Sequence, residues 1–189
     1  EITSASHSMG NNIHLEERQP VGAYSDRTDL VIKSNQGYGL GERDQVRINS
    51  AGIVTTPYQP AFDVYHNSPA YQSGNSVVSM NLNAARHNIG NHYSLSNRRF
   101  VAPVAGVYQF NFKTIVNGAT NNAHLRMYKN GSTLTGGDSH YSSSNGSWSN
   151  WSYSLTTLLS ANDYIEIATS TNIPIHGLSY QSFNGHLIG

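Results

Sequence analysis

The stretch from Gly136 to Ser154 concentrates the side chains of this sequence that are best suited to binding a neutral ligand. It reads GGDSHYSSSNGSWSNWSYS, in which Tyr141, Trp148 and Trp151 stand among serine and asparagine. Aromatic rings offer apolar contact to a sugar ring, while hydroxyl and amide groups orient its hydroxyls by hydrogen bonding. The stretch therefore predicts a ligand-binding surface formed by these three aromatic residues.

A second interpretation of the same stretch is packing. Trp151, Tyr153 and Leu155 alternate along the chain, so in a strand they would share one face, turned toward a core or another subunit. Tyr and Trp are also common at protein interfaces in general. Trp148 and Tyr141 fall outside this alternation and are the better ligand candidates, and both interpretations stay open.

No motif predicts an enzyme. GYGLGERD (37–44) has three alternating glycines but lacks the strand-to-helix context of a dinucleotide loop, so we expect a turn. GLSYQ (177–181) resembles a nucleophile elbow until Gln181 takes the place of the last glycine, which makes Ser179 an ordinary serine. The eleven acidic residues form no pair at a recognisable catalytic spacing. A binding module is therefore favoured over an enzyme, and no catalytic residue is predicted.

Metal and cofactor sites are not predicted either. The nine histidines form no HExxH and no His-x-His pair, although a symmetry axis could still gather three copies of one histidine. No cysteine is present, which excludes disulfides and thiolate metal sites.

Composition excludes two classes of partner. Charged residues make up 12% of the chain and the formal net charge is zero, so the basic footprint of a nucleic-acid-binding protein is missing. No apolar run of about 18 residues is present, which argues against membrane insertion. The first residues, EITSASHSMGNN, lack the pattern of a signal peptide, and a start at Glu1 suggests a processed product.

The elements that would position these side chains are strands. The chain is rich in Asn, Ser, Thr, Gly and Tyr, which favour strands and turns over helices. Short apolar or β-branched runs bounded by turn residues occur at 75–80, 124–128, 153–159 and 164–168. This spacing is typical of an all-β sandwich or barrel.

The first third of the chain differs from the rest. Apolar residues there occur mainly in two alternating patches, Leu30 with Ile32 and Val46 with Ile48, in related contexts that hint at a repeat. A hairpin this small is marginal alone, so residues 1–57 are predicted to be a β-rich or extended stem that needs a partner surface; the alternative is a disordered leader. Pro57 and Pro60 mark the joint, and residues 58–189 form the head.

The head contains five motifs in the order PAFDVYH, RRFVAPVAGVYQFNF, HLRMYKNGSTL, LLSANDYIEI and SFNGHLIG. In their order, and in their span of about 130 residues, they resemble the C1q-like globular domain of the C1q and tumour-necrosis-factor superfamily. Ala105, Asn162 and His186 depart from the family pattern. The resemblance implies an antiparallel jelly-roll sandwich that assembles as a homotrimer, and it allows calcium, for which no ligand motif is present.

The signature stretch predicts both a core and an assembly role. From Val107 onward, Tyr108, Phe110 and Phe112 share one strand face by alternation. In a C1q-like head part of such a row would also line the contact between subunits. The residues expected in core or trimer packing are Phe100, Tyr108, Phe110, Phe112 and Phe183.

The joint carries a second resemblance. ERDQVRINSAGIVTTPYQPAF (42–62) resembles the junction in bacteriophage tail-fibre proteins, where an Arg-Ile-Asp-Ser-x-Gly unit leads into a C1q-like tip; Asn49 replaces the Asp. This resemblance implies a homotrimeric tail-fibre or virion-appendage tip that binds a host-surface glycan or protein and joins a neighbouring virion or filament protein through its stem. The alternatives are a purely structural trimerisation or capping module of a virion or bacterial surface filament, and a secreted C1q-like lectin.

Overall fold

The computed structural model describes residues 11–17, 28–35, 42–68, 80–116, 120–143, 148–169 and 175–189. The chain divides into two compact units, 1–59 and 60–189, and each is described by itself. Most of the expected strand at 75–80 and of the expected turn at 37–44 lies outside the described residues.

The first unit contains one antiparallel sheet of four strands in chain order. The strands are β1 (Asn11–Glu17), β2 (Thr28–Asn35), β3 (Glu42–Ile48) and β4 (Val54–Thr55). The two apolar patches noted in the sequence lie on neighbouring strands, because Leu30 pairs with Ile48 and Ile32 with Val46. The two patches therefore lie opposite each other on paired strands, so the similarity of the sequences around them does not require a structural repeat.

The turn between β3 and β4 is closed by the side chain of Asn49. Its Oδ1 accepts hydrogen bonds from the backbone N–H groups of Ala51 and Ile53, both at 3.0 Å. Gly52 adopts a φ of +78°, a conformation that favours glycine. Asp29 on β2 forms an ion pair with Arg47 and accepts a hydrogen bond from the Ser50 N–H, which attaches the turn to the sheet.

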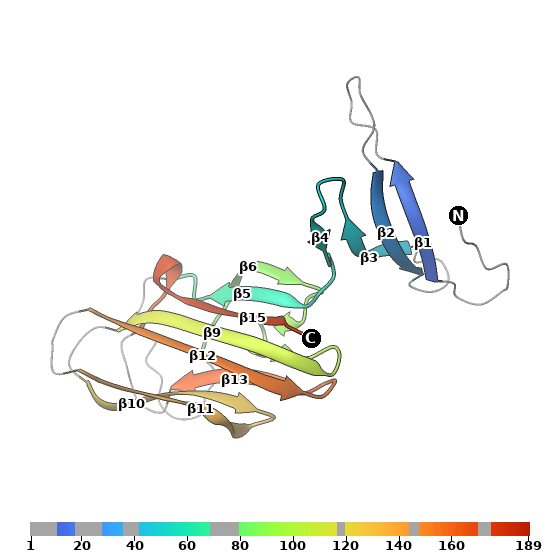
Figure 1. Ribbon diagram of the computed structural model, residues 1–189. Helices are drawn as coiled ribbons and strands as arrows, with labels where there is room; N and C mark the ends of the chain where they lie inside the picture. Colours follow the sequence, from blue (N-terminus) through green and yellow to red (C-terminus); the bar gives the residue numbers. More distant parts are fainter. Residues whose placement is uncertain are drawn as a thin grey trace. The chain divides into compact units, whose positions relative to one another are not determined.

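The second unit is a sandwich of two antiparallel sheets (Figure 1). One sheet has the order β11-β10-β13-β8-β7, and the other has the order β12-β9-β15-β5-β6, with β14 paired to β9. The elements are β5 (Ala61–Tyr65), β6 (Ala84–Ile89), β7 (Tyr93–Ser94), β8 (Arg99–Val101), β9 (Gly106–Val116), β10 (Thr120–Lys129), β11 (Ser132–Ser143), β12 (Ser149–Leu159), β13 (Tyr164–Thr169), β14 (Ile175–His176), the 3₁₀ turn η1 (Leu178–Tyr180) and β15 (Ser182–Leu187). The expected all-β jelly-roll head is confirmed.

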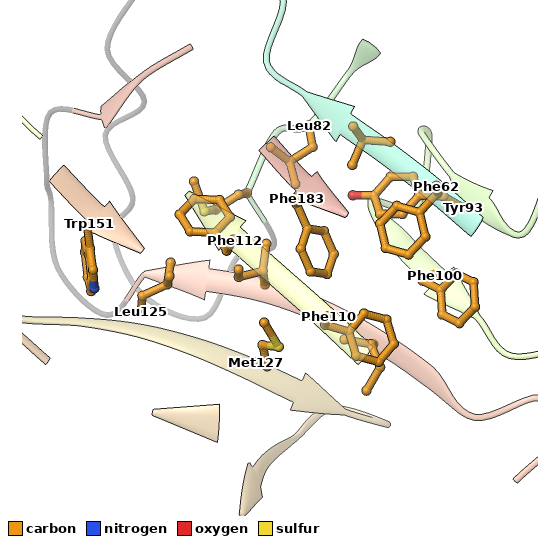
Figure 2. Close-up of a cluster of buried hydrophobic side chains, with 14 of the residues drawn as sticks. Phe62, Leu82, Tyr93, Phe100, Phe110, Phe112, Leu125, Met127, Trp151 and Phe183 are labelled. Carbon is orange, nitrogen blue, oxygen red and sulfur yellow. The ribbon is translucent and has the colours of Figure 1, made fainter. Parts of the chain in front are cut away.

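Aromatic rings fill the space between the two sheets (Figure 2). Phe62 lies 5.0 Å from Phe100, 5.1 Å from Tyr93 and 5.2 Å from Phe183, measured between ring centroids. Such tilted, stacked and edge contacts add to the free energy gained by burying the rings. The cluster joins β5, β7, β8 and β15, which are distant in the sequence.

The aromatic row of β9 belongs entirely to this core. Phe100, Tyr108, Phe110, Phe112 and Phe183 are each at most 1% exposed in a single chain. They therefore have no surface left for contact between subunits, and the expected trimer contact through Tyr108 must be corrected to core packing. The Tyr108 hydroxyl donates a hydrogen bond to the Val104 carbonyl oxygen (2.9 Å), which satisfies its polar end inside the protein.

Two asparagines hold the turns at one end of the five-stranded sheet. Asn130 (φ 52°) and Gly131 (φ 79°) form the tight turn between β10 and β11. Asn162 stands where the family usually has glycine, and its φ is 71°. Asparagine tolerates this left-handed conformation better than most residues, so the replacement is compatible with the turn. The neighbouring Asp163 accepts hydrogen bonds from the Asn130 amide and the Ser160 N–H at 2.7 Å each.

Candidate ligand-binding site

Two of the three predicted ligand residues lie inside the sandwich. Tyr141 on β11 and Trp151 on β12 are 9% and 4% exposed, and their rings stack at 5.3 Å with an interplanar angle of 28°. The Trp151 Nε1–H donates to Ser139 Oγ at 3.0 Å. Because β11 and β12 belong to different sheets, this pair joins the two layers. Neither residue offers an exposed ring face to a ligand in the single chain.

Trp148, the third predicted residue, is exposed and has two neighbours that sequence reasoning did not find. Its ring lies 5.3 Å from His176, and His176 lies 4.8 Å from Tyr180, both in edge-on contact. Trp148 is 43% exposed and Tyr180 51% exposed. We call Trp148, His176 and Tyr180 the aromatic triad.

Pairing with β9 positions the first two members of the triad. Trp148 immediately precedes β12, whose first residue, Ser149, pairs with Val116. On the other side, Ile175 of β14 pairs with the same Val116, and its buried side chain anchors His176 beside Trp148.

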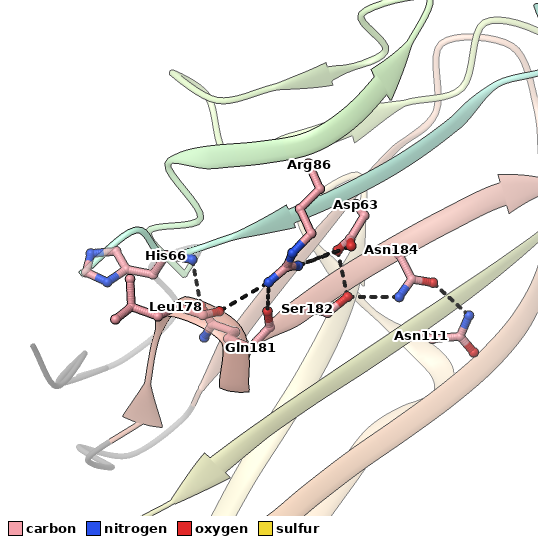
Figure 3. A network of polar contacts seen from close by, with 8 residues as sticks. All are labelled: Asp63, His66, Arg86, Asn111, Leu178, Gln181, Ser182 and Asn184. Atoms are coloured by element: carbon pink, nitrogen blue, oxygen red, sulfur yellow. Dashed lines mark hydrogen bonds and ion pairs between the residues drawn. The ribbon is translucent and has the colours of Figure 1, made fainter. Parts of the chain in front are cut away.

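The third member is positioned by the short turn η1, which is held by hydrogen bonds with His66 and Arg86 (Figure 3). The Leu178 N–H donates to the His66 carbonyl oxygen at 2.7 Å, and buried Gln181 accepts from the His66 N–H at 2.8 Å. Arg86 donates to the carbonyl oxygens of Leu178 and Gln181 at 3.2 and 3.1 Å.

A glycine is required where this turn begins. A Cβ atom on Gly177 would lie 2.4 Å from the Ser68 carbonyl oxygen and 2.5 Å from that of His66. Both are backbone atoms, so a larger residue at this position would require the chain itself to shift. The GLSYQ sequence thus forms a tight support for Tyr180 rather than a nucleophile elbow, and Ser179 is an exposed residue of η1.

The triad has the chemistry of a small neutral-ligand site. The Nδ1 of His176 lies 3.0 Å from the Gly177 carbonyl oxygen, which can only accept, so Nδ1 carries the proton and Nε2 is the acceptor in the neutral ring. Trp148 and Tyr180 supply apolar surface on either side. This combination suits a sugar ring, whose C–H face packs on an aromatic ring while its hydroxyl groups hydrogen-bond to imidazole.

A second surface feature crosses the outward face of the six-stranded sheet. Ser154, Asn111, Asn184 and Asp63 stand opposite one another on β12, β9, β15 and β5. Ser154 donates to Asn111 (2.8 Å), Asn111 to Asn184 (3.0 Å), and Asn184 to Ser182 (3.0 Å). We call this row, with Ser182, the polar ladder.

The polar ladder ends in an ion pair. Ser182 donates to Asp63 at 2.6 Å, and Arg86 on β6 binds both carboxylate oxygens of Asp63 at 3.1 Å (Figure 3). The Arg86 guanidinium also lies 4.3 Å above the Tyr65 ring. The same arginine supports η1, so the ladder and the triad share one positioning residue.

A shallow pocket lies over the ladder, and apolar side chains lie at one end of the same face. The pocket has a volume of about 280 Å³ and is lined by Asn111, Phe112, Lys113, Ser152, Tyr153, Ser154 and Asn184. Val107 and Leu158 pair across β9 and β12, point away from the core, and are 37% and 68% exposed. This apolar end and the ladder together leave the outward face suited to contact with another protein surface.

Metal-ligating groups do not assemble in the parts of the chain that the structure describes: no three His, Cys, Asp or Glu side chains lie close enough to hold an ion together. Within the same parts, no helix has the length and apolar character needed to cross a membrane.

The two-layered jelly roll and its motifs define the class of the protein. The C1q domain family model matches residues 61–188, and the chain belongs to this family. Proteins with a C1q domain are generally extracellular or secreted, and members of the wider superfamily typically serve in recognition or as structural domains. No curated protein sequence matches the chain.

Solved structures show the same fold. The globular domain of zebrafish complement 1qA is 21% identical with a TM-score of 0.56, covering 69% of this chain and 98% of that one. Eiger TNF from S. frugiperda is 7% identical (TM-score 0.55; coverage 69% and 93%), and murine APRIL is 9% identical (TM-score 0.55; coverage 69% and 99%). At these identities the likeness extends to the fold alone.

Proposed function

We propose that the chain is a receptor-binding tip of a bacteriophage tail fibre or related virion appendage, acting as a homotrimer that binds a host-surface glycan through the aromatic triad. The exposed Trp148–His176–Tyr180 cluster is the observation that carries this proposal, because it combines exposed rings with a hydrogen-bonding imidazole. The low charge of the chain favours a neutral ligand over an ionic one. An extracellular location is supported by the general location of C1q-domain proteins, and localisation on a virion is part of the proposal.

Assembly into trimers is supported by the outward face of the six-stranded sheet. Relatives in the superfamily form homotrimers. Leu158 and Val107 would be removed from water by a second copy, at about 25 cal/mol for each Å² of apolar surface. The amide groups of the polar ladder would allow the two heads to meet in only one alignment. In any other alignment, polar groups would be buried at the contact without hydrogen-bond partners, which costs free energy.

The first unit also supports assembly. Among its described side chains, Val31 is the one apolar side chain that is fully buried, whereas Ile32, Ile53 and Val54 are 38%, 57% and 60% exposed. A single sheet with so little burial gains stability from copies packed against it.

The virion assignment is supported by the resemblance of residues 42–62 to phage tail-fibre junctions. Asn49 supplies the turn-closing acceptor that an Asp would supply at the same position, so the replacement keeps the local structure of the Arg-Ile-Asp-Ser-x-Gly unit. Three heads on one fibre would raise avidity by about 10²–10⁴ over a single weak site.

Binding of the full chain to a glycan array and to candidate host cells tests the proposal. Trp148→Ala and Tyr180→Ala should each weaken binding by about 2 kcal/mol, which is roughly 30-fold, if these rings are central contacts. The matched control is Tyr58→Ala, because Tyr58 is 44% exposed but lies in the first unit. Binding that survives the Trp148→Ala/Tyr180→Ala double variant would refute the site.

A purely structural trimerisation or capping module is the second candidate. The observation that favours it is the burial of Tyr141 and Trp151, which turns two expected ligand residues into packing between the sheets. It predicts a stable trimer that binds neither glycan nor host cell. A secreted C1q-like lectin would bind glycans without any association with virions, which immunogold labelling of particles distinguishes.

A further inference from the structure

The outward face of the β10–β11 pair carries two histidines directly opposite each other. His124 pairs with His140 in the register of the two strands, and Arg126 pairs with Asp138 beside them. Ala123, Leu125 and Met127 of β10 point into the core, which leaves His124 and Arg126 on the outer surface. This surface belongs to the five-stranded sheet and includes no residue of the aromatic triad or the polar ladder.

The two imidazoles are in contact, and a carboxylate orients one of them. The ring centroids of His124 and His140 are 5.0 Å apart with an interplanar angle of 67°. The Asp138 Oδ1 lies 2.9 Å from His124 Nδ1, and Oδ2 accepts from the Arg126 Nε–H at 2.9 Å.

Asp138 determines which nitrogen of His124 is available. An ionised carboxylate only accepts hydrogen bonds, so Nδ1 of His124 carries the proton and Nε2 keeps its lone pair in the neutral ring. A carboxylate behind a histidine is the usual way in which proteins orient a metal-binding imidazole and raise its basicity.

We propose that His124 and His140 form a surface site for a divalent transition-metal ion of the Zn²⁺ class. Zn²⁺ binds imidazole nitrogen at about 2.0–2.1 Å, and the 5.0 Å between the two ring centroids is short enough for one ion to reach a nitrogen of each ring. Calcium and magnesium prefer oxygen ligands and are not expected here. Since the protein supplies two ligands, water or a donor atom of a bound molecule completes the coordination.

Asp138 also balances the charge around this site. The Arg126 guanidinium would repel a cation, but it is paired with Asp138, whose carboxylate lies between the arginine and His124. The arrangement thus places one negative charge next to the proposed ligand pair.

Titration of the chain of residues 1–189, prepared without a histidine tag, with Zn²⁺ in a calorimeter tests the site. His124→Gln and His140→Gln should each abolish the same binding event. Asp138→Asn should weaken that event by about tenfold or more, because a neutral amide is a poorer partner for the Nδ1 proton. The control is His87→Gln, an exposed histidine on β6, which should bind Zn²⁺ as the unaltered chain does.

Tryptophan fluorescence of each variant verifies that the head is folded. Zn²⁺ binding that is unchanged in both His124→Gln and His140→Gln would overturn the proposal. Unchanged binding in Asp138→Asn alone would overturn the orienting role given to the carboxylate. Glycan binding by the two histidine variants should be unaltered, so failure of the metal site and failure of the aromatic triad are separate results.

Discussion

Replacing Gly185 by alanine should destabilise the head because the added methyl group would collide with two rings, most closely with that of Phe110. Gly185 on β15 stands between Phe110 on β9 and Phe62 on β5 in the strand register. A Cβ atom at this position would lie 2.6 and 2.9 Å from Cδ1 and Cε1 of Phe110, and 2.9 Å from Cε1 of Phe62. The glycine thus leaves the space in which the two rings approach to 6.3 Å between centroids.

The two single changes have different expected costs. Gly185→Ala adds one methyl group to a filled core, and such overpacking costs about 1–3 kcal/mol of unfolding free energy. Phe110→Ala removes a fully buried ring that contacts Phe100, Tyr108 and Phe183 as well as Phe62, and should cost about 3–5 kcal/mol.

The double variant decides whether the contact causes the effect. Once the Phe110 ring is removed, the added methyl group fills vacated space and Phe62 can move toward it. Gly185→Ala should then cost close to nothing, which gives a coupling energy of about 1–3 kcal/mol between the two positions. If Phe110→Ala is too unstable to purify, Phe110→Leu provides a background with a smaller cavity.

Urea unfolding followed by tryptophan fluorescence measures these free energies. Both tryptophans, Trp148 and Trp151, lie in the head, so the signal reports on this unit. Protein concentration must be held constant, because association shifts the apparent stability. Gly189→Ala is the control, since no atom lies within 4 Å of its Cβ position. Costs at Gly185 and Phe110 that add to within about 0.5 kcal/mol would refute the reasoning.

Substitutions at three further positions test the turns and the association surface. The Lys129 side chain, followed by Asn130 and the Ser160 N–H, lowers the pKa of Asp163 to about 2, so its contribution to stability is present above about pH 4 and is lost as the pH falls toward 2. Asp163→Asn should reduce the change in urea midpoint between these two pH values, and an unaltered profile would contradict this. Asn162→Gly should be nearly neutral because φ is 71°, whereas Asn162→Val should cost about 1–3 kcal/mol in the same urea assay; equal stabilities would argue against backbone strain. Under the proposed function, Leu158→Asp should convert trimers to monomers in analytical ultracentrifugation, while a trimer that persists at micromolar concentration would exclude the outward face of β12 as the contact.

The core of the head could be predicted because alternation within one strand is a local property. Tyr108, Phe110 and Phe112 were assigned to one face of a strand from their spacing, and all three are buried. The same argument assigned Trp151, Tyr153 and Leu155 to one side, and all three pack in or against the core. The pairing of Leu30 with Ile48 was not predicted, because strand register depends on contacts between distant residues.

The candidate site was only partly predictable for the same physical reason. Tyr141 was left out of the alternating row of Trp151, but a row within one strand says nothing about a residue on another strand. β11 and β12 lie in different sheets, and both rings turn inward. Trp148 was found from composition and spacing. His176 and Tyr180 reach it only through the pairing of β14 with β9 and through η1, which no local pattern indicates.

The length of β12 makes adhesion and assembly separable by mutation. Trp148 precedes the first residue of β12 and Leu158 is next to its last, so a rise of about 3.3 Å per residue puts them roughly 33 Å apart. Under the proposed function, Leu158→Asp would leave each triad intact but release the heads from one another. The affinity of a single head for a soluble glycan should then be unchanged, whereas binding to a multivalent host surface should fall by the avidity factor of about 10²–10⁴. Equal losses of single-head affinity and of binding to the multivalent surface would mean that the triad binds glycan only next to a neighbouring subunit. The binding site would then be formed by residues of two subunits.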